Sequence, residues 1–140
     1  LFRLAHDRDR RWWSRRLLTR LADFGPDGAA ELAFLIRDAD RTARGDIPRN
    51  PHLAGIIGLC RMGPAAAAQI PAVEAMARDG TLLLSRGANG VLAVQMLIAI
   101  GIAPKRVRDL VTARPGDDPY PPDRLARDIA DALEEPDCVY

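Results

Sequence analysis

Aromatic residues make up only 5% of this 140-residue chain, and lysine occurs once, as Lys105. A core with few aromatics must be built from Leu, Ile, Val and Ala, which suits helices better than a sheet. Serine and histidine are equally rare. Neither Ser14 nor Ser85 lies in a G-x-S-x-G setting. His6 and His52 have no Cys or acidic residue at metal-binding spacing. We therefore predict no enzyme activity, no bound metal and no small-molecule cofactor.

Cysteine is also scarce, and the two cysteines do not form a CxxC pair. This pattern indicates neither a disulfide framework nor a zinc site, and Cys60, within an apolar run, is predicted to be a buried thiol. The longest apolar run, 91–103, is interrupted by Gln95 and Gly101. It is shorter than the roughly 20 residues that a membrane span needs. We see no signal-peptide pattern, and we expect a cytoplasmic protein that does not enter a membrane.

The net charge is only +1, but the charges are unevenly placed along the chain. Residues 1–20 contain seven Arg and two Asp, whereas residues 117–140 contain eight acidic residues and two Arg. The whole chain therefore has no strong attraction for nucleic acid or membrane, and its basic start and acidic end predict two different surfaces.

Three glycines, Gly25, Gly63 and Gly101, are spaced 38 residues apart. Apolar residues precede each of them at matching positions, and these are Leu18, Leu21 and Phe24, then Ile56, Leu59 and Met62, then Val94, Leu97 and Ile100. This spacing is typical of one stripe of an amphipathic helix. Each glycine is predicted to take the left-handed conformation that ends such a helix.

A second helical pattern follows each glycine. Its apolar positions are Leu32, Leu35 and Ile36 in the first unit, Ile70, Val73 and Met76 in the second, and Val107, Leu110 and Val111 in the third. A last helix is predicted over 122–133, with a stripe of Leu125, Ile129 and Leu133 and with Asp123 near its start. The repeated unit is thus a helix, a tight turn and a second helix.

The segment "GPAAAAQIPAVEAMARD", 63–79, resembles the HEAT-repeat pattern of bacterial proteins. The resemblance implies an all-α, short right-handed α-solenoid of about seven helices, forming one domain over 1–140. Its units would be 9–50, 51–87 and 88–121, followed by the helix at 122–135. Gly63 and Pro64 would end one helix and begin the next, because proline is tolerated in the first turn of a helix. Pro71 would then bend the second helix.

The N-terminal segment places a tryptophan among arginines. Trp13, Leu17, Leu21 and Phe24 follow helical spacing and are predicted to be buried, whereas Trp12 shares the other face with Arg8, Arg15 and Arg16. Such a face can anchor a protein partner or stack on a nucleic-acid base. Two structural alternatives stay open: the arginine stems could cover Trp12, or Trp12 could pack on residues before Leu1.

The second helices carry charges of both signs opposite their apolar stripes. The candidate partner-binding residues on them are Glu74, Arg78, Lys105 and Arg108, and Glu31 and Asp109 belong to the same mixed surface. A polyanion would prefer a uniformly basic groove, so the mixture favours a protein partner. We predict a non-enzymatic, HEAT-like protein-interaction module. Nucleic-acid binding through the Arg/Trp segment is the alternative, and an enzyme or accessory factor similar to bilin lyases is a third, by analogy of fold.

Overall fold

The computed structural model describes residues 20–38, 51–82, 84, 88–113 and 119–138. This part of the chain is helical, and it contains no strand. Its elements in order are η2 (Arg20–Phe24), α2 (Gly25–Asp38), α3 (Pro51–Met62), η4 (Gly63–Gln69), α4 (Ile70–Asp79), α5 (Ala88–Ala99), α6 (Pro104–Thr112) and α7 (Pro122–Glu134), where η marks a 3-10 helix. The all-α fold class predicted from the composition is confirmed for these residues.

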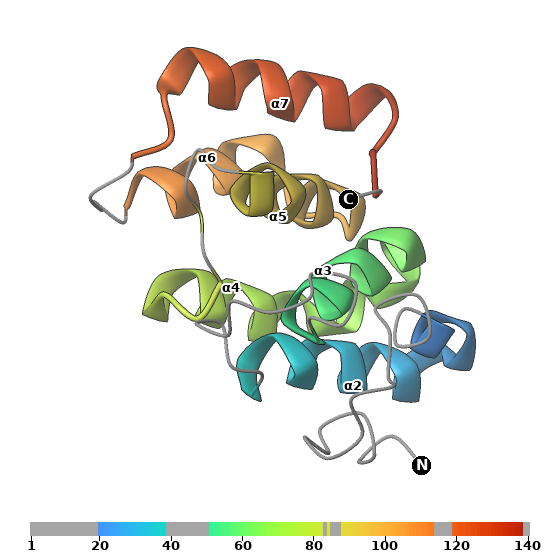
Figure 1. The fold of residues 1–140 in the computed structure, drawn as a ribbon. Coiled ribbons are helices and arrows are strands. Elements are labelled where there is room, and N and C mark those ends of the chain that lie inside the picture. Colours follow the sequence, from blue (N-terminus) through green and yellow to red (C-terminus); the bar gives the residue numbers. More distant parts are fainter. Residues whose placement is uncertain (1–19, 39–50, 83, 85–87, 114–118, 139–140) are drawn as a thin grey trace.

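The helices are arranged as a stack with α2 at one end and α7 at the other (Figure 1). Helix α3 packs between α2 and α5, and α5 packs between α3 and α7. Beside this row, α4 contacts both α2 and α6. Helices α3 and α5, α5 and α7, and α4 and α6 are therefore neighbours in space.

Helices α3 and α5 form the centre of the core. Every described side chain from His52 to Cys60 is buried, and so is every one from Leu92 to Ile100. A helix that is apolar on all sides must be covered on all sides. In contrast, α6 and α7 bury a single stripe each: Val107, Leu110 and Val111 in α6, and Leu125, Ile129 and Ala132 in α7.

The three repeat glycines have the backbone conformation that their spacing predicts. Gly25, Gly63 and Gly101 have φ values of 64°, 58° and 108°. Leu59 and Leu97 lie four residues before Gly63 and Gly101, and both are completely buried, at 0% exposure. Leu21 is only half-buried, although it packs against the core. The prediction of three equivalent buried leucines is thus right for the second and third units and partly right for the first.

Pro71 does not bend a continuous second helix, and that prediction is wrong. The chain after Gly63 forms the 3-10 helix η4 first, and α4 begins at Ile70, so Pro71 lies in the first turn of a new α-helix. The first turn leaves its N–H groups without intrahelical acceptors, so proline loses no helical hydrogen bond there. The cost of about 3 kcal/mol for a proline in a helix interior does not arise.

The apolar stripes of the second helices are predicted correctly, apart from Ile70, which is half-buried. Two other core predictions are wrong: Phe24 is 53% exposed and Leu133 is 57% exposed. In α7 the buried stripe continues from Leu125 and Ile129 to Ala132. Since successive helical residues are about 100° apart, Leu133 turns away from that stripe. The predicted buried positions Trp13 and Leu17 lie outside the described residues.

The run from His52 to Asp79, which includes α3, η4 and α4, is long and apolar enough to cross a membrane by length and composition alone. Half of its most apolar window is buried inside the fold. This is weak support for a span, because the central helix of a packed core has the same composition.

Candidate interaction surface

The residues predicted to bind a partner fall into two groups. Arg8, Trp12, Arg15 and Arg16 lie outside the described residues. Glu74 and Arg78 are on α4, and Lys105 and Arg108 are on α6. Because α4 contacts α6, the second group belongs to two neighbouring helices.

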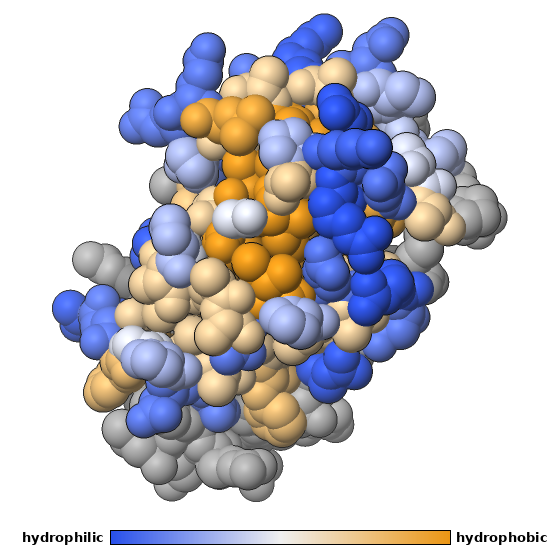
Figure 2. Space-filling view, turned by 180° about the vertical axis from the view of Figure 1, so that it is seen from behind, coloured by the Kyte–Doolittle hydropathy of each residue, from blue (hydrophilic) through white to orange (hydrophobic). Residues whose placement is uncertain are grey.

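Figure 2 shows the face of the molecule that lies behind in Figure 1. On this face, hydrophilic side chains gather in a column beside an apolar strip.

Glu74 connects α4 to α6. Its Oε1 accepts a hydrogen bond from Nε of Arg106 at 3.2 Å, and its Oε2 lies 3.7 Å from Nη1 of Arg78 one turn further along α4. The Glu74 side chain is 20% exposed, against 44% for Arg106. The structure thus brings together Glu74 and Arg78 as predicted, and it adds Arg106. The sequence shows only that Arg106 precedes the buried Val107, and it gives no sign that Arg106 pairs with Glu74.

Lys105 and Arg108 are exposed on α6, but they do not join this cluster. With about 100° between successive residues, Lys105 and Arg108 point to other sides of α6 than Arg106 does. Within the described part of the chain, neither side chain makes an ion pair. These two cations are therefore placed to meet solvent or a partner, whereas Arg106 is engaged with Glu74.

A second ion pair joins α2 to α4. Nη1 of Arg37 lies 3.5 Å from Oδ2 of Asp79, and both side chains are about half exposed. Asp79 also accepts a 2.8 Å hydrogen bond from the backbone N–H of Thr81. The hydrogen bonds from Thr81, followed by the charge of Arg37, lower the pKa of Asp79. Many of the charges on this surface thus act between neighbouring helices of the stack.

Small apolar side chains lie exposed on η4 and on the first turn of α4. They are Pro64, Ala65, Ala67, Ala68, Pro71 and Ala72. Residues 63–73 include no charged residue. The helical spacing of Ile70, Val73 and Met76 reveals the buried side of this segment but gives no sign of this uncharged outer side.

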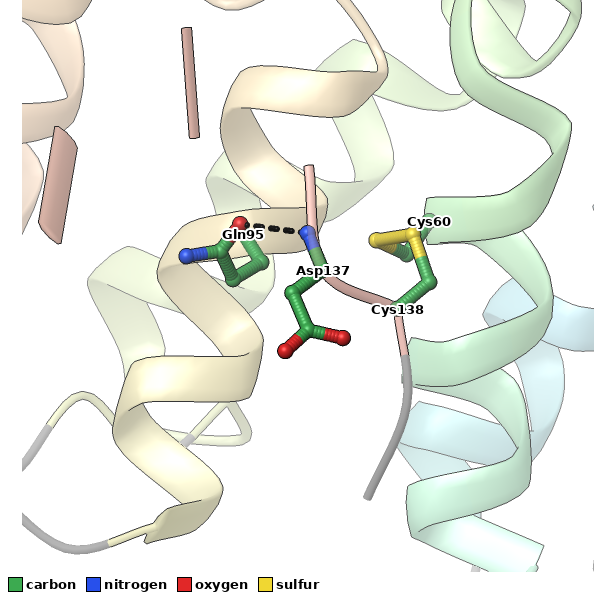
Figure 3. Close-up of a disulfide and its surroundings, with 4 residues drawn as sticks. All are labelled: Cys60, Gln95, Asp137 and Cys138. Carbon is green, nitrogen blue, oxygen red and sulfur yellow. Dashed lines mark hydrogen bonds between the residues drawn. A yellow bond between two sulfur atoms is a disulfide. The ribbon is translucent and has the colours of Figure 1, made fainter. Parts of the chain in front are cut away.

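The C-terminal tail is fastened to the centre of the core, which sequence analysis did not predict. Cys138 forms a disulfide with Cys60 of α3, with the two Cα atoms 5.6 Å apart and 78 residues between them in sequence (Figure 3). Cys60 is buried as predicted, at 3% exposure, but the expectation of a free thiol is wrong. The spacing could not reveal the pairing, because it depends on how α7 turns the chain back towards α3.

A tyrosine fixes the start of α7. The hydroxyl of Tyr120 donates a hydrogen bond to Oδ2 of Asp128, and Arg124 pairs with the same carboxylate at 3.8 Å. Burial raises the pKa of Tyr120, and the hydrogen bond to Asp128 and its negative charge raise it further. Tyr120 is thus held in its neutral form, as a hydrogen-bond donor that ties the loop to the helix.

The histidine of α3, His52, lies at the contact between two helices. His52 is in the first turn of α3, and it is only 4% exposed. Its Nδ1 donates to the carbonyl oxygen of Ile36 at 2.9 Å, so it connects α3 to α2. Among the described residues, no three His, Cys, Asp or Glu side chains gather closely enough to hold a metal ion.

Comparison of the chain with protein-family models, with curated proteins and with solved structures finds no match.

Proposed function

We propose that this chain is a HEAT-like α-solenoid module that binds a protein partner and catalyses no reaction. The observation that carries the proposal is the repeat itself. Gly25, Gly63 and Gly101 recur at one spacing, each with positive φ, and each separates two helical segments. Units of this kind cannot bury their apolar faces alone, so they stack on their neighbours.

The packing of the described helices supports a solenoid. In a solenoid, equivalent helices of successive units lie side by side. Here α3 packs on α5, and α4 packs on both α2 and α6. The ion pairs Arg37–Asp79 and Glu74–Arg106 connect the second helices of successive units. Such a stack is a rigid scaffold that holds outward side chains at set positions.

The pattern of charge supports a protein as the partner. On the second helices, acidic groups alternate with basic ones, so their fields largely cancel. A nucleic acid would require a continuous basic surface along its phosphates. We place the contact at Lys105 and Arg108, with Glu74 and Arg78 setting the shape of the neighbouring surface. The Arg8–Trp12–Arg15–Arg16 segment is the second proposed contact.

Nucleic-acid binding is the alternative function, and the observation in its favour is the seven arginines among residues 1–20. Single-stranded nucleic acid is bound by cationic side chains together with aromatic rings on which bases stack. Arginines surrounding Trp12 fit that chemistry. We propose a cytoplasmic location for either function.

Capture of partners from the native host tests these proposals. The full chain would be used as bait, with and without nuclease treatment of the lysate. A specific protein that stays bound after nuclease supports the interaction module. Loss of every partner on nuclease treatment contradicts it and favours the nucleic-acid alternative.

A charge-reversal pair then locates the surface. Lys105→Glu combined with Arg108→Glu should abolish capture of that protein, because the proposed contact reverses its sign. Arg127→Glu, an exposed arginine of α7, is the matched control and should leave capture unchanged. Equal capture by the Lys105/Arg108 double variant would show that the contact lies elsewhere.

A further inference from the structure

The tail that follows α7 is a short segment without regular structure. The backbone N–H of Glu135 donates to the carbonyl of Asp131 at 3.1 Å and completes the last turn of α7. Pro136 then prevents the helix from continuing. From Glu135 to Asp137 the residues are exposed, and Cys138 is half-buried. The tail is therefore a surface segment that needs anchors in order to stay in place.

The tail is anchored to two different helices. Cys138 is bonded to Cys60 of α3, and the N–H of Asp137 donates to Oε1 of Gln95 of α5 at 3.0 Å. Figure 3 shows Cys60 and Gln95 facing the same stretch of tail from two sides. Gln95 is a buried polar side chain, 7% exposed, between the apolar Val94 and Met96 of α5. The tail thus supplies the hydrogen-bond donor that this amide needs.

The helices beneath the tail have their own contacts. Leu125, Ile129 and Ala132 hold α7 through its buried stripe. Helix α3 packs on both α2 and α5. These helices thus keep their own buried apolar contacts in the folded state, and breaking the disulfide releases the tail from α3.

We propose that the Cys60–Cys138 disulfide is a reversible redox site, opened by a dithiol protein reductant. A thiolate of the reductant attacks Sγ of Cys138, the less buried of the two sulfurs. The bond between the cysteines breaks, and Cys60 leaves as a thiolate that takes up a proton. The second thiolate of the reductant attacks the mixed disulfide and releases Cys138, which is protonated in turn. Two electrons and two protons pass to the chain, and the reductant becomes a disulfide.

Reduction frees the tail and uncovers what lay beneath it. Once Cys138 is released, the tail has lost its covalent anchor, and the hydrogen bond from Asp137 to Gln95 exchanges with water. Gln95 and the Cys60 thiol then become accessible on the surface between α5 and α3. Cytosolic disulfides, where they occur, are usually transient and serve redox sensing or catalysis, so the inference also fits a cytoplasmic location.

Amide hydrogen exchange on the full chain tests this site. The protein would be purified without reductant, and alkylation under denaturing conditions should then label no cysteine. Dithiothreitol, under native conditions, should yield two labelled cysteines. It should also speed exchange at Asp137 and Cys138 by about tenfold or more, while α3 and α5 still exchange far more slowly than the tail. Oxidised glutathione should restore the original pattern.

Cys138→Ser is the matched control, because it cannot form the bond and leaves Cys60 in place. Its tail should exchange rapidly from the start, and dithiothreitol should change nothing. Three results would overturn the proposal: two free thiols in the protein as purified, a bond that dithiothreitol reduces only after denaturation, or exchange in α3 and α5 that becomes as fast as in the tail on reduction. The last two would identify the disulfide as a permanent staple of the fold.

Discussion

Gly55 of α3 lies directly against the backbone of Leu32 on α2. A Cβ atom at Gly55 would be 2.5 Å from the carbonyl oxygen of Leu32 and 2.7 Å from Cγ1 of Ile36. A carbonyl in the middle of a helix cannot move aside as the end of a side chain can. The close approach of α2 and α3 thus depends on the absence of a side chain at this position.

Gly55→Ala should lower the free energy of unfolding by about 1–3 kcal/mol, as overpacking of a core does. This is the opposite of the helix-propensity effect, because Ala is favoured over Gly in a helix interior by about 1 kcal/mol. Gly58→Ala is the comparison, since its new Cβ would meet the movable side chain of Leu32. Gly58→Ala should therefore lower the free energy of unfolding by less than Gly55→Ala does. Denaturant unfolding measures both, and a more stable Gly55→Ala protein would contradict the packing of α2 on α3.

Leu59 and Leu133 are the same residue type in opposite environments. Leu59 lies on the buried side of α3, and Leu133 lies on the exposed side of α7. Leu59→Ala should lower the free energy of unfolding by roughly 2–5 kcal/mol, because its side chain is completely buried. Leu133→Ala deletes the same atoms from a residue that is 57% exposed, and it should stay within about 0.5 kcal/mol of the parent. Urea melts of the two variants give both numbers. Equal losses would mean that one of the two helices is placed wrongly.

Tyr120 should make the fold sensitive to alkali. Its pKa is raised in the folded state, first by burial and then by Asp128, whereas an unfolded tyrosine has a pKa of about 10. Above that pH the unfolded chain loses the phenolic proton and the folded chain keeps it. The stabilisation is therefore complete below about pH 10 and declines as the pH rises further.

The measurement is the free energy of unfolding as a function of pH, for the parent and for Tyr120→Phe. Above about pH 10, the free energy of unfolding should decline less for Tyr120→Phe than for the parent. At neutral pH the variant should be less stable by about 1 kcal/mol, because it lacks the hydrogen bond to Asp128. Titration of the phenolate absorbance, taken as the difference between the parent and Tyr120→Phe, provides a second readout. Tyr120 should ionise well above pH 10, the usual range of a tyrosine. Ionisation of Tyr120 near pH 10 would contradict the buried hydrogen bond.

Local features of the fold could be predicted from sequence, because each depends on neighbours along the chain. The positive φ of Gly63 and Gly101 and the burial of Val73 and Val107 follow from helical periodicity. The boundary at Pro71 was missed because it depends on a change from 3-10 to α-helix. The 3-10 segment has only seven residues, too few for a period of about 3.0 to be told from one of about 3.6.

Features that join distant segments could not be predicted in the same way. The partner of Glu74 on α6 is set by the relative rotation of two helices, which selects Arg106 over Lys105. The pairing of Cys60 with Cys138 depends on the direction in which the chain leaves α7. Neither quantity is encoded within a window of the sequence, so the charged surface was predicted in outline and its contacts were not.

Trp12 provides the clearest test of the N-terminal Arg/Trp segment. If a protein binds there, Trp12→Ala should weaken the complex by about 2 kcal/mol, or roughly thirtyfold in Kd, which is the scale of an interface hot spot. If nucleic acid binds there, the affinity should fall steeply with salt, and removing a phosphate-contacting arginine such as Arg15 or Arg16 should flatten that dependence by about one unit of slope. Binding curves at two salt concentrations distinguish these outcomes. Thermal melts of the same variant provide the control: a lower melting temperature with unchanged binding would show that Trp12 packs within the fold, and the segment would no longer be a candidate site.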